Sequence, residues 1–94
     1  MPFCNSMKYE FTESSINQNA PAQSGVYGLF ADQEWIYVGE SWNIRERLLW
    51  HFRGDNPWVK RKEKPTGFTF EPIPADQRAL RQNELVEELK PVCN

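Results

Sequence analysis

The chain has 94 residues, a length that fits one small domain. Its formal net charge is −2, which excludes the strong overall basic excess of many free-standing DNA-binding proteins. No apolar run approaches the ~20 residues that span a membrane, and no secretory leader pattern is present. We therefore expect a soluble, cytoplasmic protein without a membrane partner, forming one domain over residues 1–94. Residues 1–23 are expected to be an N-terminal extension of a core from about 24 to 94.

The N-terminal extension is predicted to contribute little regular structure. Residues 8–12 alternate between polar and apolar and can add an edge strand to a sheet. Residues 13–21 are polar and rich in turn formers, and Pro21 stops any regular element. We predict a loop there, with one helical turn.

A β-hairpin is predicted over residues 25–39. Two apolar runs, Val26–Phe30 and Trp35–Val38, are separated by the polar segment Ala31–Glu34. Short apolar runs joined by a tight polar segment are typical of a hairpin. The second strand is expected to end at Gly39.

The first helix is predicted from Ile44 to about Phe52. Asn43 is a favourable N-cap, and Gly54 ends the helix. At about 100° per residue, Ile44, Leu48 and Phe52 form a stripe that should face the sheet. Arg47 and His51 are four residues apart and should lie together on the flank of that stripe.

A third strand and a last helix complete the predicted fold. Residues 67–73 alternate as a strand does, with Pro72 marking its end or an edge position. The last helix is expected from Asp76 to about Leu89, closed by Pro91. The order of elements predicts an α+β domain, a three-stranded antiparallel sheet flanked by helices.

Two tripeptides on the hairpin, followed by an arginine and a histidine on the next helix, form a specific pattern. Gly25-Val26-Tyr27 and Tyr37-Val38-Gly39 start twelve residues apart, with their tyrosines ten apart. This pattern resembles the GIY-YIG nuclease superfamily, which includes the N-terminal nuclease of the bacterial excision-repair incision subunit and homing endonucleases. The resemblance implies a GIY-YIG-like fold and a metal-dependent DNA endonuclease, which hydrolyses phosphodiester bonds with Mg²⁺ or Mn²⁺ when active.

The resemblance also implies the roles of individual residues. The catalytic set would be Tyr27, Tyr37, Arg47 and His51. The arginine would stabilise the phosphate charge, while either tyrosine or the histidine would transfer the proton. The structural residues of the motif would be Gly25, Gly39 and Asn94. The amide of Asn94 would tie the C-terminus to the sheet.

The metal ligand departs from the family pattern. The family places a glutamate three residues before the apolar pair of the last helix, and that position is Gln82 here. The helical wheel places Gln82 inward and Glu84 outward. A neutral amide is a weaker ligand for a hard dication than a carboxylate, so Glu84 in a shifted register is the alternative. The second hypothesis is a weak or inactive descendant without a cofactor, which binds nucleic acid or a protein.

The basic residues cluster after the hairpin in spite of the acidic total. The candidate nucleic-acid contacts are Arg45, Arg53, Trp58, Lys60, Arg61 and Lys62. The charged segment 55–64 is either a phosphate-contacting loop with an aromatic stacking surface or a solvated loop. DNA is the expected partner, and a protein partner that supplies affinity is a further hypothesis.

Overall fold

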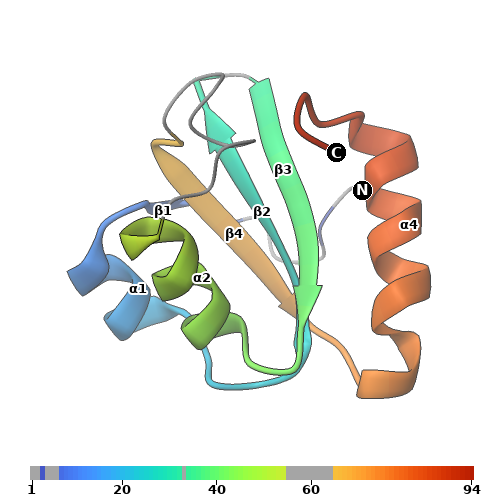
Figure 1. Ribbon diagram of the computed structural model, residues 1–94, viewed down its shortest axis with the longest axis horizontal. Helices are drawn as coiled ribbons and strands as arrows, with labels where there is room; N and C mark the ends of the chain where they lie inside the picture. The colour runs from blue at the N-terminus through green and yellow to red at the C-terminus, as the bar shows by residue number, and fades with distance from the viewer. Residues whose placement is uncertain (1–2, 4–6, 33, 55–64) are drawn as a thin grey trace.

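The computed structural model describes residues 3, 7–32, 34–54 and 65–94. The elements in chain order are β1 (Tyr9–Glu10), α1 (Glu13–Asn19), β2 (Gly25–Ala31), β3 (Glu34–Ser41), α2 (Ile44–Arg53), β4 (Gly67–Pro72), the 3₁₀ turn η1 (Ala75–Gln77) and α4 (Arg78–Leu89). The helices α1 and α2 cover one face of the sheet, and α4 covers the other (Figure 1). Among the described residues, no helix combines the length and apolar character that a membrane span requires.

The sheet has four antiparallel strands in the order β1-β4-β2-β3, so the predicted three-stranded sheet was wrong. The fourth strand is the short β1, which pairs Tyr9 with Phe68 of β4. The Tyr9 ring stacks on the rings of Phe68 and Phe70 at centroid distances of 5.3 and 5.6 Å. These aromatic contacts across distant segments stabilise a strand of two residues. The edge strand that the alternation of residues 8–12 indicated is therefore present, as β1.

The helix α1 lies where a loop with one helical turn was predicted, and that prediction was wrong. The Thr12 hydroxyl accepts a hydrogen bond from the Ser15 amide at 3.2 Å and so caps the first turn. Ile16 is the buried residue of this helix, and it packs in the main core cluster. One apolar anchor in a polar segment is not enough to produce a visible periodicity.

The helix α2 forms as predicted, with Asn43 as its N-cap and Gly54 as its C-cap. Its buried face differs from the predicted stripe, because Phe52 is 42% exposed and His51 is only 6% exposed. The helical angle explains the correction. Seven residues after Ile44, His51 returns to within about 20° of it, whereas Phe52 lies about 80° away.

The chain after α4 returns along β3 and fixes the helix against the sheet. Lys90 ends α4 in the left-handed conformation, with φ of 50°. The Asn94 side chain then bonds both backbone groups of Val38. It accepts from the amide at 2.7 Å and donates to the carbonyl at 2.8 Å. The predicted tie between the C-terminus and the sheet is confirmed.

Candidate active site

The hairpin places Tyr27 and Tyr37 on the same face of the sheet. Tyr27 lies opposite Gly39, and Tyr37 lies opposite Leu29. The two tyrosines are therefore two positions apart along the paired strands, and side chains at this spacing point to the same face. Their ring centroids are 6.2 Å apart. A Cβ atom on Gly39 would lie 2.5 Å from the Tyr27 hydroxyl and 2.8 Å from the Tyr37 ring, so the glycine gives both phenols their space.

His51 of α2 joins the two tyrosines. Its Nε2 lies 2.7 Å from the Tyr27 hydroxyl oxygen, and its ring is 5.4 and 5.5 Å from the rings of Tyr27 and Tyr37. When Nε2 is unprotonated, the Tyr27 hydroxyl donates to it. When Nε2 is protonated, it donates to the Tyr27 oxygen. This geometry is suited to moving a proton between the phenol and the imidazole.

The two phenols keep their protons at neutral pH. Burial raises the pKa of Tyr27 well above its ordinary value near 10, and Tyr37 adds to this effect while Arg47 opposes it. Burial also raises the pKa of Tyr37, again against Arg47. Each phenol therefore keeps its O–H proton in the resting site, and it must lose this proton before it can serve as a base.

Arg47 lies one helical turn before His51 and is half-buried. Its guanidinium carbon lies 5.0 Å from the centre of the Trp50 ring, a cation–π contact. Among the described residues, no carboxylate forms an ion pair with this guanidinium. Its charge is available to the non-bridging oxygens of a phosphate.

On the opposite face of the sheet, α4 supplies two arginines that bind carboxylates. Arg81 bonds Glu71 of β4 through two contacts, at 2.9 and 3.1 Å. Arg78 donates to Glu40 of β3 at 2.8 Å and to the hydroxyl of Ser24 at 3.2 Å. These ion pairs join α4 to β3 and β4 and neutralise the carboxylates that α4 meets on the sheet.

The fold of the chain has relatives among solved structures. The GIY-YIG N-terminal endonuclease domain of UvrC from Thermotoga maritima, bound to magnesium, superposes with a TM-score of 0.71 over 84% of this chain and 94% of that chain, at 20% identity. The chain has the GIY-YIG fold. A point mutant of the same domain, bound to its catalytic divalent cation, gives the same TM-score and coverage of this chain at 19% identity. No family model and no curated protein matches the chain.

The GIY-YIG structures above hold a divalent cation, but the described residues of this chain do not fit one. Gln82 of α4 is half-buried and offers only an amide oxygen. Glu84 is exposed and pairs with Arg81 at 3.2 Å, so it lies on the outer side of the helix. Glu40 is held by Arg78. Within the described part of the chain, no group of three His, Cys, Asp or Glu residues is arranged to hold a metal ion.

Two of the predicted nucleic-acid contacts have internal partners. Arg45 donates to the carbonyl of Ala20 at 2.8 Å, and Arg53 forms an exposed ion pair with Glu13 at 2.7 Å. Both arginines thereby hold α1 and the residue after it against α2. The remaining candidates, Trp58, Lys60, Arg61 and Lys62, lie outside the described residues.

A pocket beside Arg47 was missed by the sequence reasoning. It has a volume of about 190 Å³ and is lined by Ser41, Trp42, Glu46, Arg47 and Trp50. Trp42 and Trp50 are 63% and 48% exposed. The helical wheel could have predicted the exposure of Trp50, because this residue lies about 120° from the buried Ile44 and so points outward.

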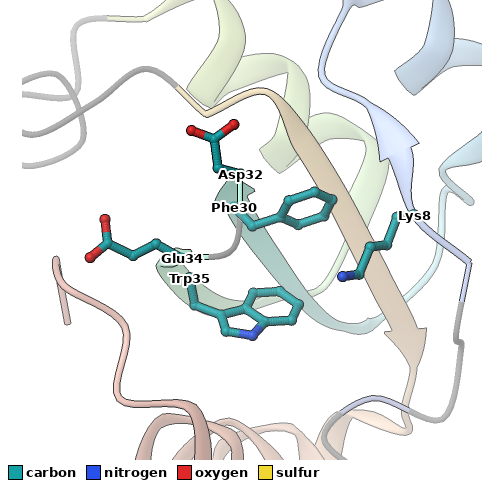
Figure 2. A pocket seen from close by; sticks show the side chains of 5 residues that line it. All are labelled: Lys8, Phe30, Asp32, Glu34 and Trp35. Atoms are coloured by element: carbon teal, nitrogen blue, oxygen red, sulfur yellow. The ribbon is translucent and has the colours of Figure 1, made fainter.

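A larger pocket, of about 370 Å³, lies at the tip of the hairpin (Figure 2). The carboxylates of Asp32 and Glu34 lie at one end, and the rings of Phe30 and Trp35 face Lys8 (Figure 2). The Lys8 ammonium is 5.1 Å from the centre of the Phe30 ring and 6.0 Å from that of Trp35. Carboxylates at its rim disfavour a phosphate, so this pocket is a poor candidate for the phosphodiester site.

Proposed function

We propose that this domain binds DNA at a backbone phosphate and hydrolyses the phosphodiester bond. The proposal rests on one observation, the contact between Tyr27 and His51 at 2.7 Å next to the guanidinium of Arg47. Hydrolysis of a phosphodiester needs a group that moves a proton and a positive charge on the phosphate. The likeness to a UvrC endonuclease domain supports this assignment.

Each residue has a defined role in the proposed reaction. Arg47 binds the non-bridging oxygens and stabilises the charge that develops on them. His51 accepts the proton that Tyr27 releases, so that the phenolate can deprotonate the attacking water. The resulting hydroxide attacks phosphorus, the bond from phosphorus to the leaving oxygen breaks, and the protonated His51 returns its proton to that oxygen. Because the carboxylate for a metal is missing, Arg47 and the phenols must supply the stabilisation, and we expect slow cleavage.

The second candidate is a binding module that does not cleave DNA. Two observations favour it, the amide of Gln82 at the expected ligand position and the ion pair that holds Glu40. A binding module needs neither Mg²⁺ nor Mn²⁺ as a cofactor. With a net charge of −2, such a domain would gain affinity from a protein partner that contributes basic surface.

A plasmid-nicking assay, with and without Mg²⁺ or Mn²⁺, tests the two candidates. We expect slow nicking by the natural sequence and a loss of about 10²-fold or more in Arg47→Ala, because that change removes the phosphate-stabilising charge. Gln82→Glu restores a carboxylate and should accelerate nicking in the presence of the metal. Leu80→Ala is the matched control, since Leu80 is an exposed apolar residue of α4.

Two other outcomes have clear meanings. Nicking that persists undiminished in Arg47→Ala would contradict the proposed site. No nicking by any variant, together with salt-dependent retention of DNA that Arg47→Ala weakens, would select the binding module.

A further inference from the structure

The pocket between Trp42 and Trp50 adjoins Arg47 but has no part in the proposed hydrolysis. Large aromatic side chains usually bury most of their surface, yet these two indoles are 63% and 48% exposed at the rim of one pocket. Trp42 comes from the segment between β3 and α2, and Trp50 comes from α2 itself. Two exposed indoles at one pocket offer stacking surfaces for a flat ligand.

Trp50 is held in place by contacts with His51 and Arg47. Its ring meets the ring of His51 in an edge arrangement, with centroids 5.0 Å apart and planes at 70°. The guanidinium of Arg47 lies 5.0 Å from the same ring. The indole is therefore fixed next to the phosphate-binding arginine, while almost half of its surface remains open.

The charges around the pocket indicate which part of a nucleotide would enter it. Arg47 lines the pocket and attracts a phosphate, whereas the carboxylate of Glu46 lines it and repels one. The backbone of Glu46 is fixed at the start of α2, where its N–H group donates to the Asn43 side-chain oxygen at 3.0 Å. A phosphate on Arg47 would direct the attached base toward the indoles, where a carboxylate accepts from an amino group such as N4 of cytosine.

We propose that this pocket binds an unstacked base of a DNA strand, adjacent to the phosphate held by Arg47. Stacking on aromatic side chains is the usual means of holding single-stranded nucleic acid, whereas a base inside a duplex cannot enter such a pocket. The substrate class is DNA with an unpaired nucleotide at the contacted phosphate, such as a single strand, a flap or an overhang. This inference rests on the proposed binding of DNA at Arg47.

Fluorescence anisotropy with labelled 12-nucleotide strands tests the proposal. The strands are oligo-dC, oligo-dT, an abasic strand of the same length, and a duplex, all in EDTA so that binding is measured without cleavage. We expect oligo-dC to bind about tenfold or more tightly than the abasic strand. Trp42→Ala and Trp50→Ala should remove most of this difference, whereas Trp42→Phe and Trp50→Phe should retain part of it.

Further variants separate the pocket from the phosphate site. Leu80→Ala should bind as the natural sequence does, because Leu80 is exposed on α4. Glu46→Gln should reduce the preference for oligo-dC over oligo-dT. Arg47→Ala should weaken the binding of every strand, including the abasic one.

The outcomes distinguish the two proposals. Equal affinity for oligo-dC and the abasic strand, with both weakened by Arg47→Ala, would overturn the base pocket and leave the DNA-binding function in place. Tighter binding of the duplex than of oligo-dC would also overturn the pocket. No binding of any strand would overturn the DNA-binding function, and the pocket proposal with it.

Discussion

The two faces of the sheet differ in the partners of their polar residues. On the face covered by α2, Tyr27 and His51 lie within hydrogen-bonding distance, and Arg47 forms no ion pair with a described carboxylate. On the face covered by α4, Glu71 and Glu40 are each bonded to an arginine. The arrangement on the α2 face is suited to moving a proton and binding an anion. On the α4 face, the carboxylates are already paired with arginines.

The difference shows how the residues proposed to act in hydrolysis can also stabilise the fold. Tyr27 is 2% exposed and packs in the main core, so its removal would disturb the protein whether or not it acts in catalysis. The ion pairs of α4 have the same dual character, since they dock the helix and neutralise carboxylates that could otherwise bind a cation. On both faces, therefore, the same residues stabilise the fold and set which ions can bind. The α2 face keeps a positive charge available to an anion, whereas the carboxylates on the α4 face are already neutralised.

The largest effect on stability is expected from removing the ion pair between Arg81 and Glu71 on the α4 face. Arg81→Met leaves the Glu71 carboxylate, whose side chain is 8% exposed, without its guanidinium partner. We expect the free energy of unfolding to fall by about 3 kcal/mol, because removing one partner of a largely buried ion pair is costly. Urea denaturation measures the change. The double variant Glu71→Gln with Arg81→Met should recover part of the loss, and a single variant as stable as the natural sequence would contradict the structural role of this pair.

A smaller effect is expected where the C-terminus meets β3. Asn94→Ala removes both hydrogen bonds to the backbone of Val38, which should lower the free energy of unfolding by about 1–2 kcal/mol. The Val38 amide should also exchange its hydrogen faster. Val92→Ala is the neighbouring control, because Val92 is 39% exposed and its side chain is not part of this tie. Equal exchange of the Val38 amide in both variants would refute the prediction.

The α2 face is best tested by its dependence on alkaline pH. The pKa of Tyr27 is raised in the folded state, so above about pH 10 the unfolded chain loses a proton that the folded chain retains. The free energy of unfolding should then fall with pH by about 1.4 kcal/mol per unit from this group, up to its folded pKa. Urea denaturation between pH 9 and 11 should show a shallower fall in Tyr27→Phe. Parallel curves for the two proteins would argue against the burial of this phenol.

Much of this protein could be predicted from local sequence. The apolar runs on either side of Ala31–Glu34 gave the hairpin, and the caps Asn43 and Gly54 gave the limits of α2. The spacing of the two tripeptides led to the GIY-YIG fold, because that motif fixes the register that brings two tyrosines to one face. Each of these signals lies within a short stretch of the chain, the range over which periodicity and capping operate.

Only the tertiary structure decided the remaining features. The pairing of β1 with β4 joins residues almost sixty positions apart, and Arg78 is separated from Glu40 by 38 positions. The exposure of Trp42 and Trp50 likewise depends on which surfaces the other elements leave uncovered. Local patterns contain no information on such contacts, because they depend on the packing of helices against a sheet that forms from distant segments.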